Sequence, residues 1–141
     1  MKSFAATIVI RAPVERIWSI LTDATGYPSW NSTVERVTGS IAFGQKLTVY
    51  TRASPGRAFP LQVSEFEPNR GMVWAGGIPL GLFRGTRTYA LTPCGAGDVE
   101  FSMREEFSGW MAPLLTRSIP DLQPVFDQFA ADLKARAERE G

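Results

Sequence analysis

Histidine is absent from this 141-residue sequence, and cysteine occurs only once, as Cys94. Without histidine, the chain lacks the commonest general base and the commonest transition-metal ligand. Catalytic systems of the Ser-His-Asp and Cys-His type are therefore excluded. A zinc site would have to combine carboxylates with a single thiol, a ligand set that zinc sites seldom use. We therefore expect no metal and no cofactor.

A single cysteine cannot form an intramolecular disulfide, which favours a reducing cytoplasm as the location. Cys94 lies in a glycine-rich segment without a neighbouring cation in the sequence, so we interpret it as incidental rather than reactive. The N-terminal residues lack the continuous apolar run of a signal peptide. No segment approaches transmembrane length, so we expect a cytoplasmic protein without membrane insertion.

An excess of charge of one sign is also lacking. The chain has 15 Lys and Arg against 14 Asp and Glu, a formal net charge of +1. Such a balance produces no field that would attract nucleic acid or an anionic membrane surface. The length, the absence of repeats and the 44% hydrophobic content indicate one ordinary domain, residues 1–141.

The sequence does contain a regular succession of short strand-like segments separated by turn residues. The first strand is expected at 3–11, where β-branched residues cluster. A helix at 13–22, with Pro13 at its first position, and a second short helix at 24–30 should follow. Five or six further strands are expected, at about 33–39, 46–54, 58–67, 71–77, 82–92 and 98–108. Strands at this spacing predict an antiparallel meander.

The C-terminal segment changes to a helical apolar period, interrupted by Pro120 and Pro124. Proline inside a helix removes a hydrogen bond and clashes with the preceding turn, at a cost of about 3 kcal/mol. We therefore predict a short helix at about 110–118, a break or sharp kink, and a long helix at about 121–138 that Asp121 caps. The apolar face of the long helix should lie against the curved face of the sheet.

Together these elements predict an α+β fold, in which a curved antiparallel sheet of about seven strands wraps around a long C-terminal helix, with two short helices after the first strand. Sheet and helix are expected to enclose a mostly apolar cavity of roughly 300 Å³ or more, a typical pocket volume. The helix break should widen one end of this cavity and form a ligand entrance, opposite or beside Trp30.

Two charges, Arg87 and Glu105, fall on the otherwise apolar face of the last two strands. The turn is expected to pair Tyr89 with Phe101 and Arg87 with Met103, which leaves Glu105 as a diagonal neighbour of Arg87. The pair could anchor a polar group of a ligand, and Glu105 could act as an acid or base. The alternative, which we favour because structural pairs outnumber catalytic ones, is an ion pair that offsets two charges at the cavity.

Aromatic residues supply the remaining candidates. Trp30, with Asn31, either rims the pocket or plugs the joint between the short helices and the sheet. Trp74 could face either way, because the sequence does not determine the register of its strand. Phe126 and Phe129 on the long helix should roof the pocket and also belong to the core.

The glycine-rich segment 76–83 lacks the following helix that a phosphate-binding loop requires. We interpret it as a hairpin flap with two apolar tips, Ile78 and Leu80, which could gate a pocket or meet a partner chain.

The most specific motif combines Ala12-Pro13, Trp18, Asp23 and Tyr27-Pro28-Ser29-Trp30-Asn31. It resembles the N-terminal pattern of the SRPBCC superfamily, the START-like and polyketide cyclase/dehydrase group, which shares the helix-grip fold of the birch-pollen allergen. The resemblance continues through Glu67-Pro68, Trp74 and the segment 105–109 ahead of the C-terminal helix, and so spans nearly the whole chain. It implies the fold but says little about function, because this fold hosts binders, carriers and enzymes.

Binding of a small hydrophobic molecule, such as a lipid, polyketide or aromatic metabolite, is the function that we expect. One alternative is a cyclase/dehydratase-type enzyme that uses Glu105, Tyr89 or Arg87 for proton transfer and oxyanion stabilisation. Another is a protein-interaction module that docks a partner, as chaperone-activator relatives of the fold do. A cavity too small for a ligand would favour this module, and a deep polar cluster in an open cavity would favour the enzyme.

No residue is assigned as catalytic, and whether the chain is an enzyme stays open. The expected ligand-binding residues are Trp30, Asn31, Trp74, Arg87, Tyr89, Phe101, Met103, Glu105, Phe126 and Phe129. No nucleic acid is expected as a partner, and a second copy of the chain remains an open alternative.

Overall fold

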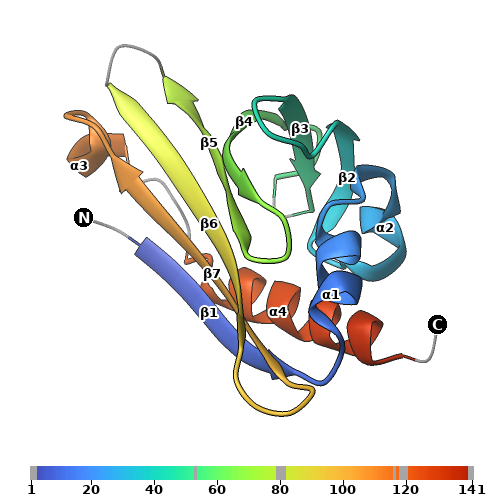
Figure 1. Ribbon diagram of the computed structural model, residues 1–141. Coiled ribbons are helices and arrows are strands. Elements are labelled where there is room, and N and C mark those ends of the chain that lie inside the picture. Colours follow the sequence, from blue (N-terminus) through green and yellow to red (C-terminus); the bar gives the residue numbers. More distant parts are fainter. Residues whose placement is uncertain (1–2, 53, 79–81, 116, 118–120, 140–141) are drawn as a thin grey trace.

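The computed structural model describes residues 3–52, 54–78, 82–115, 117 and 121–139, which form a curled antiparallel sheet around a long helix (Figure 1). The elements are β1 (Ser3–Ile10), α1 (Val14–Leu21), the 3-10 helix η1 (Ala24–Gly26), α2 (Tyr27–Trp30), β2 (Val34–Gly39), β3 (Lys46–Thr51), β4 (Ala58–Glu67), β5 (Gly71–Ile78), β6 (Phe83–Pro93), β7 (Val99–Ser108), α3 (Ala112–Leu115) and α4 (Gln123–Glu138). The strand order is β1-β7-β6-β5-β4-β3-β2.

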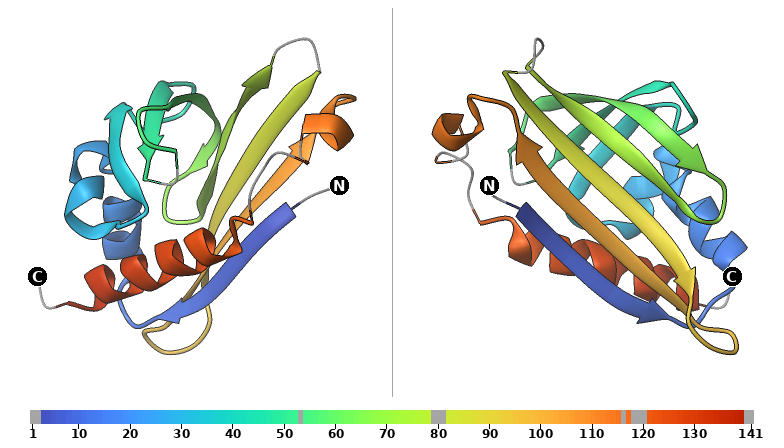
Figure 2. Two further views of the ribbon diagram at one scale, coloured as in Figure 1. Left: turned by 180° about the vertical axis from the view of Figure 1, so that it is seen from behind. Right: turned by 60° about the vertical axis from the view of Figure 1, so that its left-hand side comes forward.

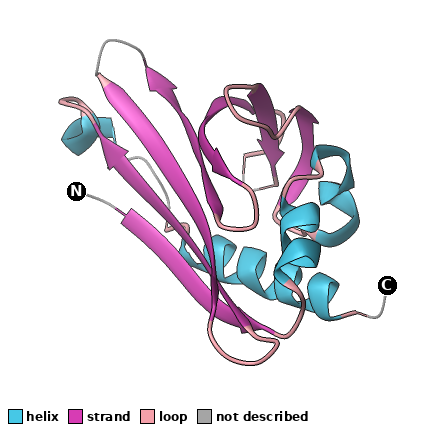
Figure 3. Cartoon of the chain, viewed as in Figure 1, coloured by secondary structure: helices cyan, strands magenta, loops and turns pink. Residues whose placement is uncertain are grey.

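The helices lie at both ends of the sheet and across its concave side (Figure 3). The long helix α4 lies beside β1 and crosses the concave side of the sheet (Figure 2). The short helices α1, η1 and α2 close one end, where they contact α4 and β2. Helix α3 lies at the other end, next to β6. The predicted α+β fold, with a seven-stranded sheet, a long C-terminal helix and short helices after the first strand, is confirmed.

The predicted break in the C-terminal helix is also confirmed. Helix α3 ends at Leu115 and α4 begins only at Gln123, so that no single straight helix runs through this segment. Pro124 lies within the first two helical positions, where its missing N–H costs no helical hydrogen bond. The predicted cap is wrong by one residue, since the N-cap of α4 is Leu122 and not Asp121. The Asp121 carboxylate still accepts a hydrogen bond from the backbone N–H of Gln123 at 3.0 Å, which satisfies one free donor of the helix start. Pro120 lies outside the described residues.

The predicted register of the last hairpin is wrong by two residues. Tyr89 lies opposite Met103 rather than Phe101, and Arg87 lies opposite Glu105 rather than Met103. A shift of two residues keeps every side chain on its predicted face, because the faces alternate with a period of two. It brings Arg87 and Glu105 directly opposite each other instead of placing them on a diagonal.

The cause of this shift is the length of the turn. Strand β6 continues to Pro93, which pairs with Val99. The turn between them is closed by a hydrogen bond from the backbone N–H of Cys94 to the carbonyl oxygen of Asp98, at 3.1 Å. Gly97 supplies the positive φ, 80°, that such a tight return requires.

The core lies between the concave face of the sheet and α4. From α4 the buried residues Phe126, Phe129, Ala130, Leu133 and Ala137 face the sheet. The ring of Phe129 is central, and its centroid lies between 5.6 and 6.3 Å from the rings of four aromatic neighbours: Tyr27, Trp30, Tyr89 and Phe101. Interlocking aromatic rings therefore fill the space that the sequence predicted as a cavity.

Candidate functional site

Arg87 and Glu105 form an ion pair on the concave face of the sheet. One oxygen of the Glu105 carboxylate accepts a hydrogen bond from Nε of Arg87 at 2.8 Å and lies 2.6 Å from Nη2 in the ion pair. The two side chains retain 23% and 16% of their exposure, so the pair is half-buried. The expectation that these two charges contact each other is confirmed.

Two aromatic side chains complete the surroundings of the guanidinium. The carbon Cζ of Arg87 lies 4.8 Å from the centroid of the Phe126 ring, in a cation–π arrangement. Nη1 of Arg87 donates a long hydrogen bond of 3.4 Å to the hydroxyl of Tyr89. Residues of β6, β7 and α4 therefore all hold this one side chain in place.

This environment determines which of the groups can exchange a proton. Burial raises the pKa of the Tyr89 phenol above 10.0, although the charge of Arg87 opposes the shift. Burial also tends to lower the pKa of Arg87, but Glu105 and Tyr89 outweigh it and raise that pKa above its ordinary value. Near neutral pH, Arg87 therefore remains charged and Tyr89 remains neutral.

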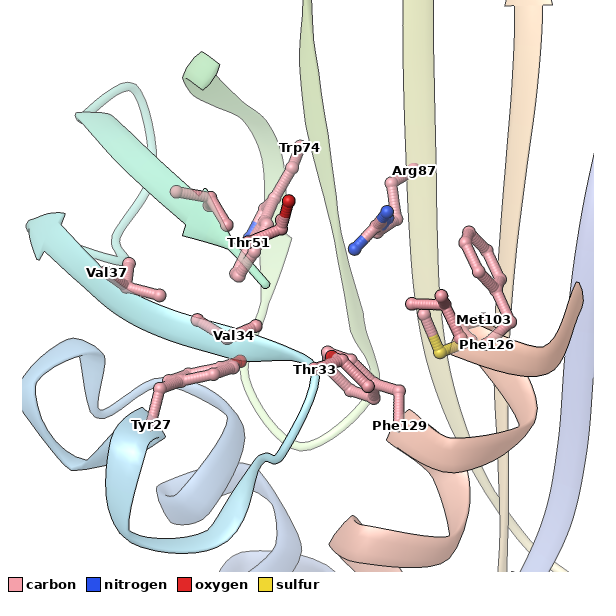
Figure 4. Close-up of a pocket in the computed structure, with 12 residues that line it drawn as sticks. Tyr27, Thr33, Val34, Val37, Thr51, Trp74, Arg87, Met103, Phe126 and Phe129 are labelled. Atoms are coloured by element: carbon pink, nitrogen blue, oxygen red, sulfur yellow. The ribbon is translucent and has the colours of Figure 1, made fainter. Parts of the chain in front are cut away.

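A small cavity lies next to the ion pair, and Figure 4 shows the guanidinium of Arg87 pointing into it from β6. Its volume is about 30 Å³. A water molecule needs roughly 10–15 Å³, so the cavity has room for about two. The residues that line it are Tyr27, Thr33, Val34, Val37, Val49, Thr51, Trp74, Arg87, Met103, Val125, Phe126 and Phe129. We call this space the inner cavity.

The inner cavity is far smaller than the predicted 300 Å³ or more, and that prediction is wrong. Its physical cause is the aromatic packing around it. The ring centroids of Trp74 and Tyr89 are 4.9 Å apart, and those of Phe101 and Phe129 are 6.2 Å apart with nearly parallel planes. Since these contacts have the spacing of a protein core, they leave room only beside Arg87.

An open groove adjoins the inner cavity at the start of α4. It has a volume of about 380 Å³ and is lined by Ser32, Thr33, Arg52, Pro124, Val125 and Gln128. We call it the outer groove. Thr33 and Val125 line both spaces, so the outer groove and the inner cavity are adjacent. The outer groove lies where α4 begins after the helix break, the place at which the sequence predicted an entrance.

The predicted site residues fall into two groups. Trp74, Arg87, Met103, Phe126 and Phe129 line the inner cavity. Those outside its lining are Trp30, Asn31, Tyr89, Phe101 and Glu105, of which Tyr89 and Glu105 contact Arg87.

The structure decides how the two tryptophans lie. Trp74 faces inward and is 2% exposed. Trp30 is half-buried and packs with its ring 4.9 Å from that of Tyr27 and 5.6 Å from that of Phe129. It thus packs between α2 and α4, whereas the plug interpretation placed it between the short helices and the sheet. The neighbouring Asn31 is buried, and its side-chain oxygen accepts hydrogen bonds from the N–H and hydroxyl of Thr33 at 2.9 and 2.6 Å.

Sequence reasoning missed the polar residues between the outer groove and the inner cavity. Thr33, Thr51 and Arg52 come together because the β2–β3 pairing brings the start of β2 to the end of β3. Thr51 had a usable signal, since it continues the inward alternation of Leu47 and Val49. Thr33 and Arg52 lie in or beside loops and had none. Of the predicted apolar flap, Leu80 lies outside the described residues, as does the side chain of Ile78.

Within the described part of the chain, no group of three or more Cys, Asp or Glu side chains is placed to hold a metal ion. The helices described there are too short or too polar to cross a membrane.

A family model described as "Polyketide cyclase / dehydrase and lipid transport" matches residues 1–138. No curated protein matches the chain. Among solved structures, the chain is similar to a START superfamily protein from Mycobacterium smegmatis, with a TM-score of 0.69 and 16% identity over 96% of this chain and 97% of that one.

Two solved enzymes share the fold. The Zhui aromatase/cyclase from Streptomyces sp. R1128 has a TM-score of 0.75 and 13% identity, covering 98% of this chain and 94% of that one. A point mutant of norcoclaurine synthase from Thalictrum flavum, in complex with a transition state analogue, has a TM-score of 0.71 and 13% identity, covering 96% and 93%. At these identities the similarity establishes the fold.

Proposed function

Given that the chain belongs to the polyketide cyclase/dehydrase and lipid transport family, we propose that it binds a small, largely hydrophobic molecule where α4 begins. The observation that carries this proposal is the adjacency of the outer groove and the inner cavity, with a charged group, Arg87, at the inner end. Ligand sites are concave, mostly apolar, and use a few polar groups to orient the ligand.

From the two volumes we infer which part of the ligand each space would hold. The outer groove, at about 380 Å³, falls within the usual range of roughly 300–1,000 Å³ for small-molecule sites. The inner cavity, at about 30 Å³, takes only the tip of a molecule. In this arrangement the body of the ligand lies in the outer groove against Pro124 and Val125, and its tip reaches toward Arg87.

A cyclase-type enzyme is the alternative, since an aromatase/cyclase and norcoclaurine synthase share the fold. Its weakness is the protonation of the candidate residues. Arg87 stays charged and Tyr89 stays neutral near pH 7, because of the pKa shifts described above. Neither is therefore suited to exchange a proton in that range, although Arg87 could stabilise an oxyanion.

The small inner cavity favours a second alternative, a protein-interaction module. Two large apolar side chains at the far end of the sheet, Trp110 and Leu114, are 73% and 60% exposed. Exposed apolar groups of this size are typical of interaction surfaces. We place this alternative second because these residues lie on and beside α3, away from Arg87 and the outer groove.

The proposal is tested with the fluorescent probe 8-anilinonaphthalene-1-sulfonate and two tryptophan substitutions on α4. Val125→Trp should block the outer groove, whereas Ala131→Trp adds the same ring at an exposed position of the same helix. We expect saturable binding to the wild type and to Ala131→Trp, and at least tenfold weaker binding to Val125→Trp. Equal binding by both variants, or no saturable binding by the wild type, would overturn the proposal.

A further inference from the structure

Two residues that line the inner cavity, Trp74 and Arg87, belong to one row of residues across the sheet. Trp74 of β5 lies directly opposite Arg87 of β6, and Arg87 lies directly opposite Glu105 of β7. Directly paired residues share one face of the sheet, with their Cβ atoms about 4.5–5.5 Å apart. The indole of Trp74 and the guanidinium of Arg87 therefore extend from neighbouring strands into the same space (Figure 4).

The indole N–H of Trp74 has no hydrogen-bond partner among the described residues, although the side chain is only 2% exposed. A buried N–H normally has a partner, because leaving it unpaired costs about 1–3 kcal/mol. The indole nitrogen is a donor only and cannot accept a hydrogen bond in any protonation state. Its missing partner must therefore be an acceptor, supplied by a water molecule or a ligand.

Arg87 adds further donors to the same end of the cavity. A guanidinium carries five N–H groups. Nε donates a hydrogen bond to Glu105, Nη1 donates one to the Tyr89 hydroxyl, and Nη2 contacts Glu105 in the ion pair. The remaining two N–H groups have no partner within the part of the chain that the structure describes. Arg87 thus strengthens the preference of this corner for a hydrogen-bond acceptor.

The charge of the acceptor follows from Glu105. Its carboxylate lies 2.6 Å from Nη2 of Arg87 and already neutralises the guanidinium. A second anion in the cavity would gain little from a guanidinium that Glu105 already neutralises, and the nearby carboxylate of Glu105 would repel it, although Glu105 does not line the cavity. A neutral oxygen gains the two donors without that repulsion.

We propose that Trp74 and Arg87 select a ligand that inserts a neutral carbonyl oxygen into the inner cavity and leaves its apolar body in the outer groove. This inference rests on the proposed binding function and specifies its ligand class. Trp74 Nε1–H and a free N–H of Arg87 donate to the same oxygen. The row Trp74–Arg87–Glu105 then acts as a specificity-determining group, in which Glu105 excludes carboxylates.

The test compares three probes of nearly the same shape. Acetophenone carries a ketone oxygen, α-methylstyrene replaces that oxygen with a CH₂ group, and benzoate replaces the acetyl group with a carboxylate. Each is titrated into the ¹⁵N-labelled protein, and the resonance of the Trp74 indole N–H is followed. We expect acetophenone to bind about tenfold more tightly than α-methylstyrene, to bind more tightly than benzoate, and alone to move the indole resonance downfield.

The substitution Trp74→Phe keeps an aromatic ring and removes the N–H. We expect it to bring the affinity for acetophenone down to that for α-methylstyrene, while Trp110→Phe, at an exposed position, changes neither. The indole resonance of the wild type decides the question even if Trp74→Phe fails to fold. Equal binding of ketone and hydrocarbon without an indole shift, or tightest binding of benzoate, overturns the inference and leaves the proposed function standing. Failure of all three probes and of the fluorescent probe overturns both.

Discussion

Arg87 and Glu105 lie directly opposite each other on β6 and β7, and one carboxylate oxygen contacts both Nη2 and Nε of the guanidinium, at 2.6 and 2.8 Å. They bring a positive and a negative charge to the concave face of the sheet, next to the buried residues Met103 and Phe126. Removal of one partner leaves the other as an uncompensated charge in surroundings of low polarity. We therefore expect the pair to stabilise the fold as well as to belong to the candidate site.

The substitution Glu105→Gln should lower the free energy of unfolding by about 1–3 kcal/mol, since it leaves Arg87 without its counter-charge. The value lies below that for a fully buried pair because both side chains are partly exposed. Urea denaturation measures the change. Glu106→Gln is the matched control, because Glu106 is 49% exposed and lies 3.6 Å from Arg104. If both variants unfold at the wild-type midpoint, Glu105 has no structural role.

The fold could be predicted from the sequence because its signals are local. Pro120 and Pro124 predicted the helix break from backbone chemistry alone, and the alternating residues of β6 and β7 predicted which side chains face inward. The register of that hairpin could not be predicted, because it depends on whether the turn begins before or after Pro93.

The volume of the inner cavity was equally inaccessible to sequence reasoning. The alternation along the strands predicts that aromatic residues face the helix, but it does not predict how their rings interlock. Trp74, for example, faces inward because its strand pairs it with Arg87, a long-range relationship that no local pattern reveals. Residues brought together by strand pairing at a loop, such as Thr33 and Arg52, were missed for the same reason.

Phe129 should be among the costliest positions to truncate. It is 2% exposed, and its ring contacts the rings of Tyr27, Trp30, Tyr89 and Phe101. We expect Phe129→Ala to lower the free energy of unfolding by about 3–5 kcal/mol. In Phe43→Ala, which removes a ring that is 68% exposed, the change should stay within about 0.5 kcal/mol. A loss below about 1 kcal/mol for Phe129→Ala would contradict the packing described here.

Gly39 and Gly56 offer a comparison between backbone strain alone and strain with a clash. Both have positive φ angles, +98° and +77°. A Cβ atom at Gly39 would lie 2.5 Å from the backbone oxygen of Lys46 on the paired strand, whereas at Gly56 nothing lies within 4 Å. Gly56→Ala should therefore cost about 1 kcal/mol and Gly39→Ala more than about 2 kcal/mol. Thermal unfolding of both variants measures the difference, and equal losses would show that β2 and β3 separate easily at this point.

Alkaline pH should destabilise the protein through Tyr27 and Tyr89. Burial raises the pKa of both phenols above 10.0. The folded protein therefore keeps two protons that the unfolded chain releases once the pH exceeds about 10. The stability that depends on the neutral phenols is fully present below that pH, and it is lost as the pH rises toward the folded-state pKa values. Each tyrosine contributes a slope of up to about 1.4 kcal/mol per pH unit.

Tyr89→Phe tests this assignment more cleanly than Tyr27→Phe. The hydroxyl of Tyr27 donates a 2.7 Å hydrogen bond to the carbonyl oxygen of Leu21, which a phenylalanine would lose at every pH. The hydroxyl of Tyr89 accepts only a long hydrogen bond, 3.4 Å, from Arg87. Urea denaturation between pH 8 and about pH 11.5 should give a shallower alkaline loss for Tyr89→Phe than for the wild type, by up to the contribution of one tyrosine. If the curves of the two proteins are parallel, the Tyr89 phenol ionises as readily in the folded protein as in the unfolded chain. Burial beside Arg87 would then not raise the pKa of Tyr89, and the assignment would be wrong.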